Sequence, residues 1–154
     1  MGNIIHGVAT NLEEESFDWM IGASVSEIAF LEPYSWRFHF STGGSCQMDA
    51  TPWRLVGAQG IVASSEDHLQ KFGLPAPVDS REVALAALAS TRVLDARLRE
   101  NAPDLLIRFE GDLVLELLVH SRCYEGWITC DPSGRCLVVH GTRSAATWQT
   151  PSST

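Results

Sequence analysis

Two five-residue stretches decide the fold: Trp36-Arg37-Phe38-His39-Phe40 and, 69 residues later, Leu105-Leu106-Ile107-Arg108-Phe109. In each, large apolar side chains stand two residues apart, and this alternation is typical of a strand with one buried face. A turn and another strand-like segment follow both stretches, with Gly43-Gly44 in the first turn and Gly111-Asp112 in the second. The two stretches therefore predict two similar β-meanders, as an internal duplication would give.

Short strand-like segments continue along the chain, separated by turns rich in Gly, Pro and Asp. Strands spaced in this way by tight turns favour an antiparallel sheet. We expect strands at 25–31, 36–40, 45–50, 53–63 (interrupted near Gly57 and Gly60), 93–98, 105–109, 113–119, 127–130 and 136–140.

Two helices are expected beside these strands. Asp79 with Glu82 three residues later fits a capping box, and it predicts a helix over 80–90. We expect this helix to pack across a sheet. Asn11, a good N-cap followed by acidic residues, predicts a short N-terminal helix that ends by Gly22. Residues 64–68 resemble the capped start of one or two further helical turns.

The predicted fold class is therefore α+β, mainly antiparallel β-sheet built from two similar β-meanders. We expect one domain over 1–154, with meander 1 at about 21–63, the connecting helix at 80–90 and meander 2 at about 91–149. The residues expected in its core are Trp36, Phe38, Phe40, Ile107, Phe109, Leu115 and Trp127. The stretch 131–135 predicts a hairpin turn with Gly134 in the left-handed conformation and Cys130 opposite Cys136.

The composition restricts the partners that the protein can have. The formal charge is −8, and residues 1–80 hold ten acidic and three basic side chains. Nucleic acids and anionic membranes bind dense Lys and Arg, so neither is an expected partner. No apolar run approaches the ~18 residues of a transmembrane helix, and 1–10 is not a secretory signal. We expect a cytoplasmic protein in which the four cysteines are thiols.

Several patterns were weighed as reactive sites. The last third of the chain holds five potential zinc ligands, namely His120, Cys123, Cys130, Cys136 and His140. Only His120 and Cys123 have the spacing of a ligand pair. Asp67-His68 beside two serines is more typical of a helix cap than of a catalytic triad, and Glu125 has no second carboxylate marked out for a glycosidase. Phosphate-binding glycine loops are not found. We expect no catalytic residue, metal or cofactor, and the protein is more typical of a binding protein than of an enzyme.

Three motifs resemble a family of small, uncharacterised bacterial α+β proteins, over residues 20–141. They are Ser65-Glu66-Asp67-His68 with Phe72-Gly73-Leu74-Pro75, Asp104-Leu105 running to Phe109-Glu110-Gly111, and Tyr124-Glu125-Gly126-Trp127. Relatives often end the final hairpin in consecutive glycines, where this chain has Gly141-Thr142-Arg143. The resemblance implies no catalytic residue. As a small acidic α+β protein, the chain also resembles immunity proteins of bacterial toxin systems.

These observations lead to two functional hypotheses. The first is a non-catalytic binding protein, an immunity protein that neutralises a basic toxin or enzyme by protein–protein contact. Its partner-binding residues would be the acids of the first half: Glu13, Glu14, Glu15, Asp18, Glu66 and Asp67. The alternative is a small-ligand-binding or enzymatic domain with a pocket between the two meanders.

Overall fold

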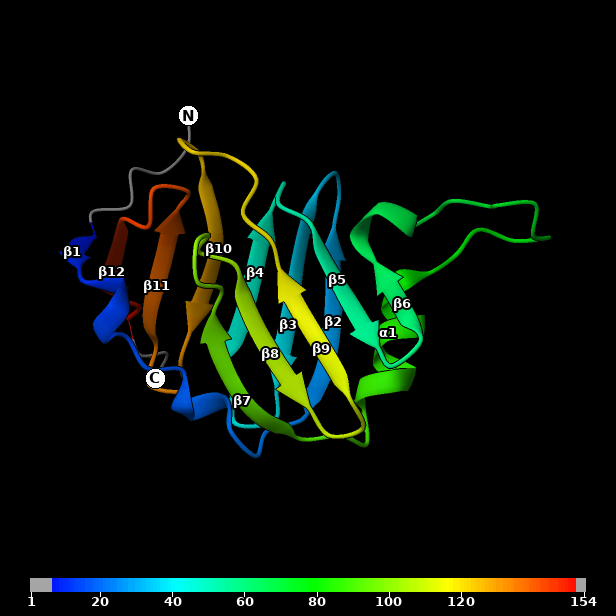
Figure 1. Cartoon of the computed structure of the whole chain (residues 1–154), viewed down its shortest axis with the longest axis horizontal. Helices are drawn as coiled ribbons and strands as arrows, with labels where there is room; N and C mark the ends of the chain where they lie inside the picture. The colour runs from blue at the N-terminus through cyan, green and yellow to red at the C-terminus, as the bar shows by residue number, and fades with distance from the viewer. Residues whose placement is uncertain (1–6, 152–154) are drawn as a thin grey trace.

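The computed structural model describes residues 7–151. Within them the chain forms two antiparallel sheets, which lie face to face, and a single α-helix (Figure 1). A mainly antiparallel α+β architecture is thus confirmed, with little helix. None of the helices among these residues has the length and apolar character needed to cross a membrane.

The larger sheet has seven strands in the order β1-β12-β11-β10-β4-β3-β2. Their bounds are β1 Val8–Thr10, β2 Val25–Leu31, β3 Ser35–Phe40, β4 Ser45–Asp49, β10 Glu125–Cys130, β11 Arg135–His140 and β12 Ala145–Gln149. The smaller sheet has the order β6-β5-β9-β8-β7. It contains β5 Trp53–Gly57, β6 Gly60–Ser64, β7 Val93–Leu98, β8 Leu105–Phe109 and β9 Leu113–Leu117.

The two sheets share strands from both halves of the chain. β4 pairs with β10 in the larger sheet, and β5 pairs with β9 in the smaller sheet. Each sheet therefore contains strands from both halves of the chain. The segment 53–63, expected as one interrupted strand, is instead the hairpin β5–β6, because the chain turns between Gly57 and Gly60. β12 was not expected, since Ala145–Gln149 holds small and polar residues without a clear period.

Alternating side chains of the two sheets meet in the core. All seven residues expected there are buried: Trp36, Phe38, Phe40, Ile107, Phe109, Leu115 and Trp127. Trp53 joins them at the centre, and its ring meets Phe38 edge-on with 5.1 Å between ring centroids. Side chains of this size fill the space between the sheets.

Helix α1 (Ser80–Leu88) confirms the helix expected near 80–90. The Asp79 side chain caps it by accepting a hydrogen bond of 3.0 Å from the backbone N–H of Arg81. We expected this helix to pack across a sheet, but it contacts β2 and β6, the edge strands of the two sheets. The helix therefore closes one open edge of the sandwich (Figure 1).

The prediction of one short N-terminal helix after Asn11 is wrong. The chain makes two separate 3₁₀ turns instead, η1 (Leu12–Glu14) and η2 (Asp18–Met20). Leu12, Phe17 and Met20 are all buried, and their spacing does not place them on one stripe of an α-helix. Separate tight turns allow each of these side chains to reach the core.

The hairpin β10–β11 confirms its predicted geometry. Gly134 has φ +90°, and its N–H donates a 3.0 Å hydrogen bond to the carbonyl of Asp131. Cys130 lies directly opposite Cys136, with Cα atoms 4.0 Å apart. The expectation that both are thiols is corrected, because the two sulfur atoms form a disulfide.

Candidate functional site

The six acidic residues expected to bind a partner form two groups far apart. In the first group, Glu13, Glu15 and Asp18 line a surface hollow beside β7, whereas Glu66 and Asp67 belong to η3 (Ser65–Asp67), which follows β6. β6 and β7 are opposite edges of the smaller sheet, so the two groups lie at opposite ends of the molecule (Figure 1). The first group is Glu13, Glu14, Glu15 and Asp18.

Two acids of the first group are engaged within the protein. Glu15 pairs with Arg135 through two hydrogen bonds of 2.7 Å and accepts a third, also of 2.7 Å, from the Thr10 hydroxyl. The hydrogen bonds from Arg135 hold the pKa of Glu15 below its usual value, and its side chain is only 8% exposed. Glu13 pairs with Arg143. These contacts neutralise two carboxylates that a partner would otherwise meet.

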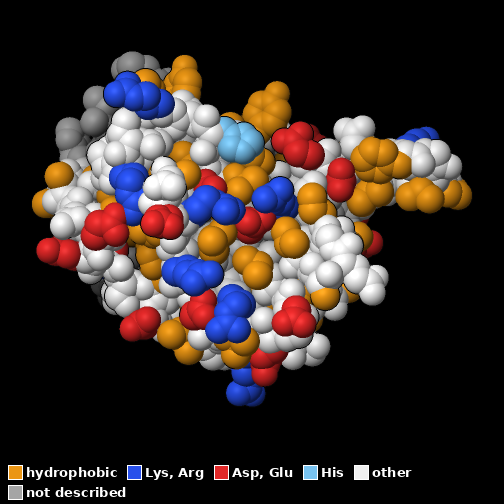
Figure 2. All heavy atoms as spheres, in the orientation of Figure 1, with side chains coloured by type: hydrophobic (Ala, Val, Ile, Leu, Met, Phe, Trp, Pro, Cys, Tyr) orange, Lys and Arg blue, Asp and Glu red, His pale blue; other side chains and the backbone are white. Residues whose placement is uncertain are grey.

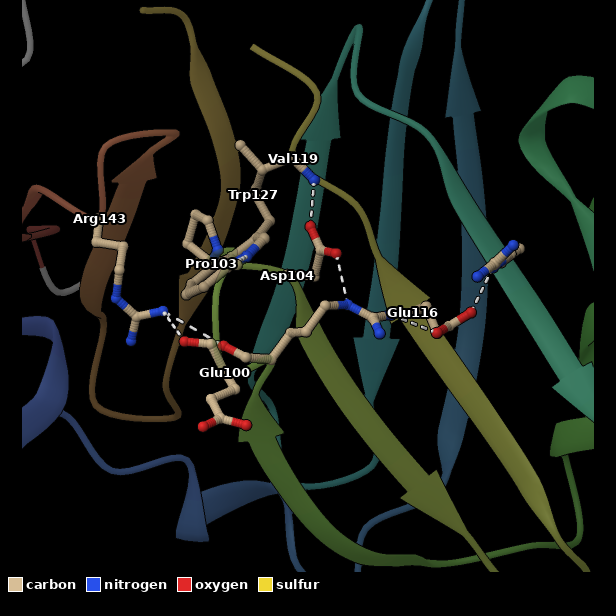
Figure 3. A network of polar contacts seen from close by, with 9 residues as sticks. Glu100, Pro103, Asp104, Glu116, Val119, Trp127 and Arg143 are labelled. Carbon is tan, nitrogen blue, oxygen red and sulfur yellow. Dashed lines mark hydrogen bonds and ion pairs between the residues drawn. The ribbon is translucent and has the colours of Figure 1, made fainter. Parts of the chain in front are cut away.

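A second polar network covers the outer face of the smaller sheet (Figure 3). The Asp104 carboxylate accepts hydrogen bonds of 2.8 Å from the N–H of Val119 and from Arg99. Arg99 also binds Glu116 at 2.7 Å, and Arg54 pairs with the same carboxylate. Each charged side chain of the network pairs with one of opposite charge. The network therefore links strands and turns, and its role is structural.

The patterns weighed as reactive sites do not assemble one. The disulfide uses two of the five zinc-ligand candidates, and the described residues hold no group of three or more His, Cys, Asp or Glu side chains fit for a metal. The Ser65 hydroxyl binds the backbone of Trp53, accepting at 3.0 Å and donating at 3.3 Å. His68 is directed at the start of α1, so these two side chains do not form a catalytic pair.

His68 is a buried anchor beneath a projecting segment. Its Nδ1 accepts a 3.1 Å hydrogen bond from the N–H of Ser80, and its ring lies edge-on to Phe30 and Trp36 at 4.8 and 4.9 Å between ring centroids. Burial lowers the pKa of His68, although the carboxylate of Asp79, 3.8 Å away, opposes this effect. His68 therefore accepts from Ser80 as a neutral imidazole.

The segment after His68 extends away from the two sheets (Figure 1). We name residues 69–78 the projecting loop. Two backbone hydrogen bonds close its base, from Leu69 N–H to Val78 O at 2.7 Å and from Val78 N–H to Gln70 O at 2.8 Å. Residues 71–77 are all exposed, and Phe72 is 68% exposed. Figure 2 shows hydrophobic side chains along its length.

The backbone of this loop adopts a defined and unusual shape. Leu69 and Phe72 have φ of 66° and 47°, in the left-handed region that non-glycine residues rarely adopt. Such residues concentrate at ligand clamps and other functional positions. From the sequence, Phe72-Gly73-Leu74-Pro75 of this loop stood out only as a motif of the family resemblance, which implies no role for it. The available signal was Phe72 and Leu74 standing among breakers, where turn residues are normally polar.

Comparison of the chain with known protein families, with curated proteins and with solved structures gave no match.

Proposed function

We propose that this chain is a non-catalytic binding protein that acts by protein–protein contact, and that the projecting loop is its main contact element. The observation that carries the proposal is the exposure of Phe72 and Leu74, 68% and 54%, on a segment that extends beyond the sheets. A run of exposed apolar side chains that contributes nothing to a core is typical of an interaction site.

The loop is suited to binding because little order must be gained when a partner docks. Pro75 and Pro77 restrict the backbone, and the two hydrogen bonds at the base fix the ends. A contact segment that is already ordered avoids part of the entropy cost of association.

Two acids at the base of the loop favour a basic partner, and the loop itself carries one cation, Lys71. Glu66 and Asp67 stand at its base in η3, and the whole chain carries a formal charge of −8. Opposite charge speeds encounter with a basic protein and disfavours acidic ones. An immunity-type role against a basic toxin fits this chemistry. The cytoplasmic location expected from the sequence stays a prediction, since a disulfide is more typical of oxidising compartments.

The experiment measures association with the basic product of a neighbouring gene. Phe72→Asp should abolish binding at both low and high salt, because it removes an apolar contact. Asp67→Asn, which removes an acid at the base of the loop outside any apolar contact, should mainly slow association at low salt. Tyr124→Asp, at an exposed aromatic residue outside the loop, is the matched control and should bind normally. Unchanged binding by Phe72→Asp would remove the loop from the proposal.

One observation favours the alternative of a ligand-binding or enzymatic domain. A cavity of about 550 Å³ lies between the end of β4 and the start of β10, and its lining includes Asp49, His120, Glu125 and His140. A metabolite that co-purifies with the chain, detected by native mass spectrometry and lost in His140→Ala, would favour this function over the first.

We also propose that the two meanders descend from one duplicated unit. The support is the strand register. The pairs Val25–Phe40, Ile28–Phe38 and Phe38–Cys46 in meander 1 correspond to Val93–Phe109, Ala96–Ile107 and Ile107–Leu115 in meander 2. In the first hairpin of each meander, the strand register shifts directly after the first residue pair, between Val25 and Glu27 in one and between Val93 and Asp95 in the other. The exchanged strands correspond too, since Trp53 faces Leu117 as Trp127 faces Met48.

A further inference from the structure

A small cavity lies at the base of the projecting loop, between the β2–β3 turn and η3. Its volume is about 370 Å³, at the lower end of the range for ligand pockets. Three aromatic side chains line it, namely Phe30, Tyr34 and Trp36. Phe30 and Trp36 pack against each other with 4.6 Å between ring centroids, and Tyr34 is 67% exposed at the rim. The cavity therefore has room for one long side chain and offers it aromatic surfaces.

The polar groups of this cavity suit a cation. Among residues 7–151, Glu66 is the one carboxylate that lines the cavity, and no Lys or Arg lines it. His68, also part of the lining, adds no positive charge because its Nδ1 accepts from Ser80. The Thr51 hydroxyl oxygen is buried and has no hydrogen-bond partner among the described residues. This oxygen is fully covered, so a ligand in the cavity would lie beside Thr51 without contacting the oxygen itself.

We propose that this cavity receives an arginine side chain of the partner protein. The inference rests on the proposed function and names the chemistry by which the basic partner is held. A guanidinium group stacks on aromatic rings, pairs with a carboxylate and donates several hydrogen bonds in one plane. Here these would be met by the rings of Tyr34 and Phe30 and by the Glu66 carboxylate.

Other occupants fit these groups less well. An anionic ligand would be repelled by Glu66, and a purely apolar side chain would leave the Glu66 carboxylate without a partner of opposite charge. A guanidinium pairs with this carboxylate while its plane contacts the aromatic rings. Because the cavity adjoins the loop, one partner surface can contact both.

The test uses Nα-acetyl-arginine amide as the probe, with the neutral isostere Nα-acetyl-citrulline amide as its control. Titration of the full chain, followed by NMR, should give saturable shifts of the signals of Tyr34, Thr51 and Glu66 with arginine. Citrulline should bind about tenfold more weakly or not at all, as should arginine to Glu66→Gln. Glu14→Gln, an exposed acid of the other group, should behave like the unaltered chain. Thermal unfolding of both variants checks that the fold is kept.

Equal binding of the two probes, shifts elsewhere on the surface, or failure to saturate would overturn the arginine pocket. The proposed function is tested separately by Phe72→Asp. If that variant loses the partner while Glu66→Gln and Tyr34→Ala retain full affinity, the binding function stands and the arginine pocket fails. If all three variants lose affinity, both proposals are supported.

Discussion

At the scale of single residues, Cys130 and Cys136 join the two strands of the β10–β11 hairpin by a disulfide. The hairpin turn at 131–135 could be derived from Pro132 and Gly134, and with it the facing positions of Cys130 and Cys136. Their oxidation could not be derived, because it depends on the compartment assumed for the protein. The geometry places the two sulfur atoms within bonding reach regardless of compartment.

We therefore expect two thiols per chain, not four, when the protein is purified without reductant and denatured before thiol titration. Cys46 and Cys123 would be the two that react. Reduction should raise the count to four and lower the free energy of unfolding by about 2 kcal/mol, because the bond closes only a short loop. Cys130→Ser should give three thiols with or without reductant. Four thiols before reduction would contradict the disulfide.

Two phenylalanines provide a matched test of the core. Phe109 is fully buried between the sheets, whereas Phe72 is 68% exposed in the projecting loop. Phe109→Ala should lower the free energy of unfolding by about 3–5 kcal/mol. Phe72→Ala should change it by no more than about 0.5 kcal/mol. Urea denaturation compares the two, and similar losses would show that the loop is part of the cooperative core.

At the scale of elements, strands were predicted better than the segments that join them. Alternation in β3 and β8 shows directly which side chains are buried, so their bounds followed from the sequence. The N-terminal turns were mistaken for a helix because Asn11 is a true cap, with its side chain accepting from Glu13 N–H at 3.1 Å. A cap does not reveal how far a helix continues. Continuation here is prevented by burial of Leu12 and Phe17, which tertiary packing decides.

The ion pair between Glu15 and Arg135 fastens the N-terminal turns to the β10–β11 hairpin. Since the pKa of Glu15 is lowered in the folded chain, its contribution to stability is present above the ordinary value of 4.5 and is lost as the pH falls through the folded value. Glu15→Gln should lower the free energy of unfolding by about 1 kcal/mol near pH 7. The difference from the unaltered chain should shrink near pH 3 in urea denaturation. Glu14→Gln should show no such dependence.

His68 makes the base of the projecting loop sensitive to acid. Its folded pKa lies below the ordinary 6.5, so the unfolded chain binds the proton more readily. Stability is therefore complete above 6.5 and declines as the pH falls toward the folded value. Protonation at Nδ1 would also break the hydrogen bond from Ser80. His68→Gln keeps an acceptor that does not titrate, and it should reduce the loss of stability between about pH 7 and pH 5. His120→Gln is the control. The same dependence of the unfolding free energy on pH in the unaltered chain, His68→Gln and His120→Gln would contradict this role.

At the scale of the whole molecule, the pairing of the two halves lay beyond the sequence pattern. The existence of two meanders follows from local alternation. The exchange of strands, β4 with β10 and β5 with β9, depends on contacts between segments far apart in the chain. No local propensity encodes which edge a later strand will join. The candidate site was missed for a related reason, since the cavity at the loop base combines β2, β3, residues 50–52 and η3.

This exchange predicts that neither half folds alone. A cut in the exposed loop at Gly73 would separate β1 through β6 from α1 and β7 through β12. The first fragment would leave β4 without β10, and the second would leave β9 without β5, so each would expose a sheet face and an unpaired edge.

We expect each fragment to lack a cooperative unfolding transition, and an equimolar mixture to regain the near-ultraviolet circular dichroism of the intact chain. The disulfide lies within the second fragment, so no covalent bond would join the two. The full chain cleaved in the loop by a protease, and not otherwise separated, is the control and should stay folded because residues 71–77 make no core contact. Independent folding of either fragment would mean that the sandwich is two stable units in contact, contrary to the exchanged strands that define it.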